Sequence, residues 1–203
     1  MKVAIIKADL VRAKEKGMYY YFSNTDFYFS ALNNSGAIRA ATGAALQFVL
    51  VDTPNDIYNT WSALGTINGN TYHVNTAIIN LHGCPAYMLS SDGQTIIASN
   101  FAQKDVDTIV LLSCETGQLI AGNNGNNVAQ QFVLGQNTNL VIAPERSALG
   151  TVVPGRELSK YYSKPSNGYN TAYLSYTKGM NGNLLYPLTN FVQEKTIIDI
   201  LNL

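Results

Sequence analysis

The chain has 203 residues, no net formal charge and 46% hydrophobic residues, and only 13% of its residues are charged. This composition can bury a full core, while the balanced charge gives no indication of nucleic-acid binding or of a polybasic membrane anchor. No apolar run approaches the roughly 20 residues of a membrane-spanning helix. Lys7 and Asp9 interrupt the apolar N-terminal run and no small-residue cleavage site follows, so we expect no signal peptide and, by default, a cytoplasmic location.

The N-terminal part, residues 1–45, contains two aromatic stretches. MYYYF (18–22) and DFYFSAL (26–32) favour β-strands, because aromatic residues fit a pleated, half-buried surface. Residues 33–45, NNSGAIRAATGAA, are small and polar and predict a flexible loop. We therefore expect N-terminal strands followed by a loop.

The central part of the chain alternates apolar runs with helical patterns. Apolar runs of strand length recur at 46–52, 75–81, 107–113 and 139–145. Residues 53–65 predict a helix, because Thr53 and Asp56 match a capping box and Pro54 fits the first turn. Residues 128–133 place apolar side chains on one face of a second helix. This alternation predicts a mostly parallel sheet with helices on both faces, an α/β fold.

The flanking parts complete one predicted domain. Residues 86–99 predict a hairpin with its turn at Asp92 and Gly93. Residues 146–203 predict loops, antiparallel strands and a terminal helix. The domain therefore consists of an N-terminal part (1–45), an α/β core (46–145) and this C-terminal part.

Two of the apolar runs end in a reactive side chain. TAIINLHGCP (76–85) carries His82, and TIVLLSCETG (108–117) carries Cys114. In parallel sheets, ligands and chemistry gather at the C-terminal ends of the strands, so neighbouring strands would bring the imidazole and the thiol together. An imidazole can activate a thiol and later protonate a leaving amine. The backbone N–H groups of Gly83 and Cys114 are candidate oxyanion-hole donors. Together with the imidazole and the thiol, they are the minimum set of groups needed for acyl transfer.

The two motifs resemble the caspase-like (clan CD) cysteine peptidases. An apolar strand ending LHG and a later one ending LLSC, followed by ETG, are similar to this group over residues 46–145. The context is closer to clostripain, the gingipains and the self-processing peptidase domains of bacterial toxins than to the caspases. Caspases have Gln-Ala before the cysteine and Gly two residues after it, whereas here Ser113 precedes Cys114 and the glycine is Gly117.

The resemblance implies a role for each matched residue. His82 would be the general base and acid, Cys114 the nucleophile, and the Gly83 and Cys114 amides the oxyanion hole. In this family the residues around the cleft set specificity. Glu145 there would favour Arg or Lys before the cleaved bond, and Arg146 would favour an acidic residue. The departure from the caspase motif argues against caspase-type specificity for aspartate.

Simpler explanations exist for the same residues. A cysteine at a strand end is often a small buried hydrophobe. Cys84 and Cys114 at adjacent strand tips could form a disulfide, or His82 with both cysteines and His73 could hold a metal. His73 lies about 30 Å from His82 along an extended strand, which favours a surface role for it. The Asn/Gly-rich residues 121–127 lack the Lys of a phosphate-binding loop and instead predict a helix cap from Asn126 or Asn127.

The sequence thus predicts a cysteine endopeptidase with a His/Cys dyad that acts on a peptide, a protein or its own chain. Its chemistry needs no cofactor or metal, and no nucleic-acid or membrane partner is expected. A rival hypothesis is an inactive pseudo-peptidase that uses the same sheet as a binding or structural module. A third is an acyltransferase or a module that acts only in cis.

Overall fold

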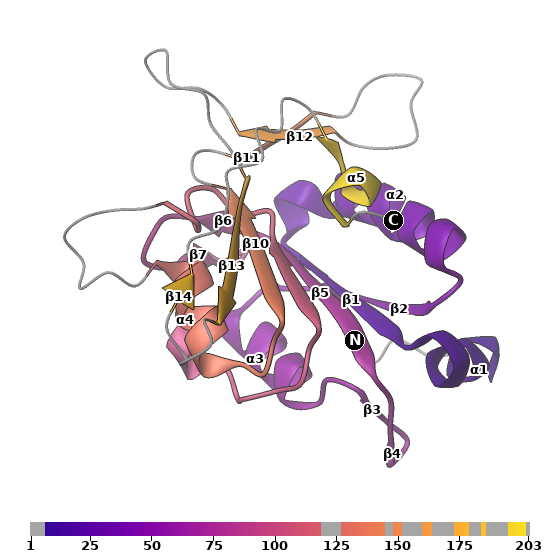
Figure 1. Cartoon of the computed structure of the whole chain (residues 1–203). Helices are drawn as coiled ribbons and strands as arrows, with labels where there is room; N and C mark the ends of the chain where they lie inside the picture. Colours follow the sequence, from indigo (N-terminus) through magenta and orange to yellow (C-terminus); the bar gives the residue numbers. More distant parts are fainter. Residues whose placement is uncertain are drawn as a thin grey trace.

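A seven-stranded sheet forms the centre of the molecule in the computed structural model, which describes residues 7–118, 127–144, 148–151, 160–163, 173–178, 184–185 and 195–201 (Figure 1). The strand order is β14-β13-β10-β9-β5-β1-β2. The strands span β1 Met18–Ser23, β2 Ala45–Leu50, β5 Val74–Asn80, β9 Thr108–Leu111, β10 Leu140–Pro144, β13 Tyr173–Lys178 and β14 Leu184–Leu185. The first five pair in parallel, and β13 and β14 join antiparallel. The predicted mostly parallel α/β fold is confirmed.

Helices cover both faces of the sheet (Figure 1). The helices are α1 Lys7–Lys16, α2 Tyr28–Thr42, α3 Pro54–Ser62, α4 Val128–Gly135 and α5 Ile197–Leu201. Side chains of α3 and α4 share one buried cluster with the sheet, including Trp61 and Phe132. Side chains of α2 and α5 form a second cluster on the other face, including Ile38 and Ile197. Because each face is covered, the strands are apolar throughout rather than alternating.

Strand β1 lies inside the sheet, between β5 and β2. All six of its residues are buried. Tyr20 and Phe22 face the cluster of α3 and α4, and Tyr19 and Tyr21 face the cluster of α2. The aromatic run that predicted a strand is therefore a central element of the core, although it precedes the region 46–145 in which the core was expected.

The predicted caps of α3 and α4 are confirmed. In α3, Thr53 and Asp56 form a capping box, and the Thr53 N–H donates to Asp56 at 2.7 Å. In α4, the side chain of Asn127 accepts from the N–H of Gln130 at 2.9 Å. These contacts satisfy N–H groups that the first helical turn leaves without a partner.

Residues 26–45 differ from the prediction. The DFYFSAL stretch is not a strand, and residues 33–45 are not a flexible loop: a 3-10 turn, η1 (Thr25–Phe27), leads into α2, which ends where Gly43 adopts φ 66°. The buried face of α2 consists mainly of small or polar residues, namely Ala31, Asn34, Ser35 and Ile38. Such a face gives little hydrophobic periodicity, so the helix was missed. Helix α1 was not predicted either.

Short strands complete the described structure. The predicted hairpin is confirmed, since β7 (Met88–Leu89) pairs antiparallel with β8 (Thr95–Ile96) and Gly93 in its turn has φ 78°. The remaining strands are β3 Thr66–Ile67, β4 Asn70–Thr71, β6 His82–Gly83, β11 Ala148–Thr151, β12 Lys160–Ser163 and β15 Lys195–Thr196. In the described ranges, every helix is too short or too polar to cross a membrane.

Candidate active site

His82 and Cys114 follow two strands that are neighbours in the sheet. Strands β5 and β9 pair in parallel, and each Cα pair in this ladder joins residues 32 positions apart. His82 and Cys114 are also 32 positions apart. The ladder continues past the strands, because the Leu112 N–H donates to the Ile79 carbonyl at 2.8 Å. The two residues thus both come shortly after the C-terminal ends of neighbouring parallel strands, His82 in the short strand β6 and Cys114 in a turn.

The ladder residues before the two tips alternate between the faces of the sheet. Ile79 and Leu111 belong to one cluster, whereas Ile78 and Leu112 belong to the cluster of α2. This alternation does not extend beyond the strands, because the chain bends after each one. The direction of the His82 side chain is therefore defined by its own contacts.

Asp26 and Phe27, which lead into α2, hold the imidazole of His82. Nε2 of His82 lies 2.8 Å from Oδ2 of Asp26, and the Phe27 ring centroid lies 4.9 Å from that of the imidazole. The His82 side chain is 49% exposed and therefore open to a substrate. With the Nε2 proton donated to Asp26, Nδ1 is the acceptor that remains in the neutral ring.

Gly83 lets the His82 segment touch the Cys114 segment. A Cβ at Gly83 would lie 2.9 Å from the Cβ of Ser113 and 3.0 Å from the Cys114 carbonyl oxygen. Only a residue without a side chain allows this approach. On the other side of His82, the Leu81 N–H donates to the buried Ser113 hydroxyl at 3.2 Å. The two strand tips are therefore in contact on both sides of His82, through Leu81 and through Gly83.

The amide of Gly83 points away from the hairpin that carries it. Strand β6 pairs with β7 through His82 opposite Leu89 and Gly83 opposite Met88, and the Cys84 N–H donates to Tyr87 O at 2.9 Å. Hydrogen-bonded and non-hydrogen-bonded pairs alternate in an antiparallel ladder. Because Cys84 is in a bonded pair, Gly83 is in a non-bonded one, and its N–H does not point at β7.

A tight turn follows Cys114. Glu115 adopts φ 57°, which is unfavourable for a residue with a side chain, and the Thr116 hydroxyl donates to Ser113 O at 2.8 Å. The Gly117 N–H then donates to the Pro144 carbonyl at 2.9 Å, which ties the turn to the end of β10. The turn leaves Cys114 partly exposed. Part of this residue is therefore accessible from solvent.

The alternative roles of the cysteines find no support in this geometry. Cys84 and Cys114 do not form a disulfide. His73 is exposed, lies at the other end of β5 and pairs with Asp107 at 2.7 Å, so it is far from any cluster around His82. No group of three His, Cys, Asp or Glu residues that could hold a metal occurs among the residues with described positions.

Sequence reasoning missed Asp26, and the structure leaves two predicted residues undescribed. Asp26 follows a strand at the same edge as His82 and Cys114, and this position could have drawn attention to it. The aromatic pattern of residues 26–32 favours a strand, and in a strand Asp26 would not follow one. Glu145 and Arg146 lie outside the described residues, although the end of β10 that precedes them adjoins the Cys114 turn.

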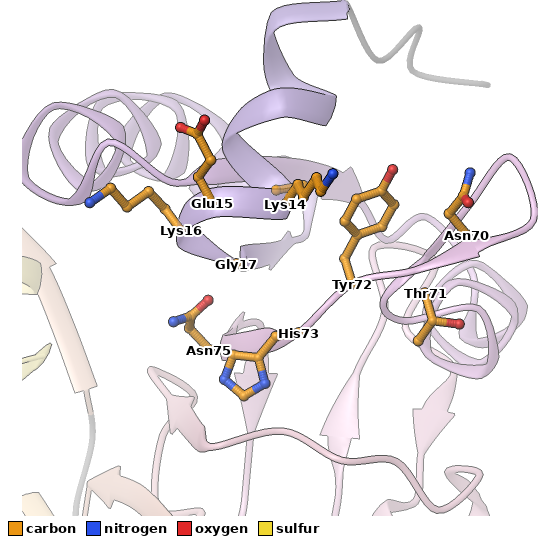
Figure 2. Close-up of a pocket in the computed structure, with 10 residues that line it drawn as sticks. Lys14, Glu15, Lys16, Gly17, Asn70, Thr71, Tyr72, His73 and Asn75 are labelled. Atoms are coloured by element: carbon orange, nitrogen blue, oxygen red, sulfur yellow. The ribbon is translucent and has the colours of Figure 1, made fainter.

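A pocket of roughly 830 Å³ lies at the opposite end of the sheet (Figure 2). Its wall is formed by the C-terminal end of α1 with Gly17, and by residues 70–73 and Asn75. Lys14 and Lys16 belong to the last turn of α1, where positive charge complements the helix dipole. The pocket includes neither His82 nor Cys114 and is separate from the candidate site.

The geometry defines an α/β protein with an Asp–His contact and a cysteine at one edge of a mostly parallel sheet. No protein-family model matches the chain, and no curated protein matches it at a significant level.

Proposed function

We propose that the protein is a caspase-like cysteine endopeptidase in which Cys114 is the nucleophile and His82 the general base and acid. One observation carries the proposal: the two residues follow neighbouring parallel strands, and their segments meet where the Gly83 backbone approaches Ser113 and Cys114. The contact between His82 and Asp26 adds an orienting carboxylate to the proposed dyad.

The proposed reaction starts with proton transfer from the Cys114 thiol to Nδ1 of His82. The thiolate attacks the peptide carbonyl carbon, and the N–H groups of Gly83 and Cys114 stabilise the resulting oxyanion. The C–N bond then breaks, and His82 gives its proton to the leaving amine. A water molecule, deprotonated by His82, hydrolyses the thioester and restores the thiol.

Asp26 would act through His82 rather than on the substrate. By accepting the Nε2 proton it fixes the tautomer in which Nδ1 can accept a proton from the thiol. It also stabilises the imidazolium that forms in each step. The chemistry uses no cofactor or metal.

Substrate preference is part of the same proposal. Glu145 directly follows β10, whose end adjoins the Cys114 turn. A carboxylate at this rim would pair with Arg or Lys before the cleaved bond and give about tenfold or greater discrimination over a neutral residue. A peptide library tests this: a preference for acidic residues would favour Arg146 as the selecting residue, and a preference for Leu would exclude both. The partner is a peptide, a protein or the chain itself, and the expected cytoplasmic location stays a prediction.

Labelling of the two thiols tests the proposed activity. A peptidyl acyloxymethyl ketone should modify Cys114 much faster than Cys84, and His82→Ala should abolish that difference. Cys84 is a suitable internal control because both thiols are partly exposed. Equal, slow labelling would contradict the proposal and favour the inactive binding module. The masses of purified wild type and Cys114→Ala would distinguish self-processing from cleavage of other substrates.

A further inference from the structure

Helix α2 begins with large apolar side chains that face solvent. Tyr28, Phe29 and Leu32, here called the α2 patch, are 37%, 77% and 47% exposed. Isolated exposed apolar residues are common, but neighbouring ones in a patch often mark a binding surface. Phe29 and Leu32 are three positions apart on the helix, and Tyr28 and Leu32 are four apart, so the three side chains adjoin.

The α2 patch is continuous with the residues that hold His82. Phe27, whose ring contacts the His82 imidazole, directly precedes Tyr28. The Tyr28 ring packs edge-on against Phe48 at 5.7 Å and against Phe29 at 5.5 Å, so the start of the patch has a fixed position on the sheet. The first turn of α2 therefore lies at the same sheet edge as His82.

Further exposed apolar side chains surround this edge. Tyr87, 38% exposed, is in the hairpin that begins with His82, and Leu50, 37% exposed, ends β2. With the α2 patch they make five of the eight exposed large apolar side chains in the described part of the chain. Residues 28–38 carry no charged side chain. The chemistry of the α2 patch itself therefore suits an apolar group rather than an ionic one.

We infer that the α2 patch binds a bulky apolar side chain of an extended polypeptide substrate, at a distance from the cleaved bond. This inference rests on the proposed function. From Phe27, which contacts His82, to Leu32 is about 7.5 Å at a helical rise of about 1.5 Å per residue, and an extended chain covers that in roughly two to three residues. The substrate class is an unfolded or extended segment with Phe, Leu or a similar residue about two to five positions from the scissile bond.

Peptide binding to an inactive protein tests the inference directly. Fluorescein-labelled Gly/Ser peptides of equal length, each with one Phe at a different position, are titrated against Cys114→Ala, and fluorescence anisotropy gives the Kd. Burying one such side chain corresponds to about tenfold tighter binding. We expect the peptides with Phe at the matching positions to bind about tenfold more tightly than an all-Gly/Ser peptide.

Substitutions identify the surface. Phe29→Ser and Leu32→Ser, each in the Cys114→Ala background, should remove the preference for Phe. Val11→Ser is the matched control, because Val11 is 52% exposed on α1, away from the α2 patch. Circular dichroism verifies that each variant is folded, and having two patch variants protects the test against the failure of one. The inference would be overturned if Cys114→Ala with an unchanged patch, the two patch variants and the Val11→Ser control all preferred Phe equally.

The outcomes separate this inference from the proposed function. If the Phe preference depends on the patch but Cys114 of the unsubstituted protein is not selectively labelled, the patch binds polypeptide and the peptidase proposal is wrong. If Cys114 is selectively labelled but the patch variants bind all peptides like the control, the inference is wrong. If the patch instead mediates self-association, Phe29→Ser should have a smaller mass by light scattering than the unsubstituted protein while its peptide binding is unchanged. This result would also overturn the inference.

Discussion

Oδ2 of Asp26 lies 2.8 Å from Nε2 of His82, which links the end of β1 to the end of β5. The carboxylate can hold the imidazole in one tautomer and orientation, as outer carboxylates commonly do for functional histidines. Asp26→Asn should therefore lower kcat/KM for a peptide substrate, by up to about 10⁴-fold, since Asn in place of the carboxylate favours the wrong tautomer. Steady-state kinetics with a peptide substrate measure the effect.

The second histidine provides the control for this substitution. His73 pairs with Asp107 at 2.7 Å, a similar contact at the other end of β5. Asp107→Asn removes one surface carboxylate and one His–Asp contact without touching the candidate site. It should leave kcat/KM unchanged. An equal loss of activity in both variants would show that Asp26 has no special role.

Gly83→Ala should disturb the junction of the two strand tips. The new methyl group would lie 2.9 to 3.0 Å from atoms of Ser113, Cys114 and Thr116, so the Cys114 segment must move. Overpacking of this kind costs about 1–3 kcal/mol of stability. We expect a lower thermal midpoint and at least about a tenfold loss of Cys114 labelling rate, since misplacement of reacting groups by about 1 Å can cost 100-fold. Unchanged labelling would argue that Gly83 does not set the position of Cys114.

Gly36→Ala should stabilise the protein. Gly36 is in α2, is exposed, and a Cβ there would meet nothing within 4 Å. Alanine in a helix interior is favoured over glycine by about 0.5–1 kcal/mol. Chemical denaturation should show this gain in the free energy of unfolding, with Cys114 labelling unchanged. The variant is also the matched glycine control for Gly83→Ala, and a destabilisation would contradict the packing around α2.

Ser113→Ala should destabilise the protein and loosen the candidate site. The buried Ser113 hydroxyl accepts from the Leu81 N–H at 3.2 Å, and alanine would leave that N–H without its acceptor. An unsatisfied buried donor costs about 1–3 kcal/mol in the free energy of unfolding. Urea denaturation measures this change, with Ser62→Ala as the control because Ser62 bonds to Tyr58 O at an exposed position. A loss no larger than that of the control would exclude a clamping role for Ser113.

Asp92 should titrate below the ordinary range of an aspartate. The Ser90 hydroxyl bonds to its carboxylate and lowers the pKa, and the Gln94 N–H adds to this effect. A pKa that is lower in the folded state means that the turn is stabilised above the unfolded pKa and loses this stabilisation as the pH falls through the folded pKa. Carbon-detected NMR titration should show a higher Asp92 pKa in Ser90→Ala. An unchanged pKa would show that the hydroxyl does not cause the shift.

Much of the sheet could be predicted because it is determined locally. Four apolar runs from 46 to 145 became strands of the sheet, and the capping residues at Thr53 and Asn127 begin the two helices between them. These signals are local, because a doubly buried strand needs a continuous apolar run and a helix start needs side-chain acceptors for its first N–H groups. The same apolar runs predict that His82 and Cys114 directly follow strands.

The sequence by itself determined strands β2, β5, β9 and β10, helices α3 and α4 and the β7–β8 hairpin, and it indicated which residues follow the strands. Only the tertiary structure decided that β1 enters the sheet between β5 and β2, since strand order depends on long-range pairing that no local pattern encodes. It also decided that residues 28–42 form a helix, because the small and polar residues on its inner face are buried only by packing on the sheet. That packing brings Asp26, 56 residues away in the chain, to His82, and the pairing of β5 with β9 makes the segments of His82 and Cys114 neighbours.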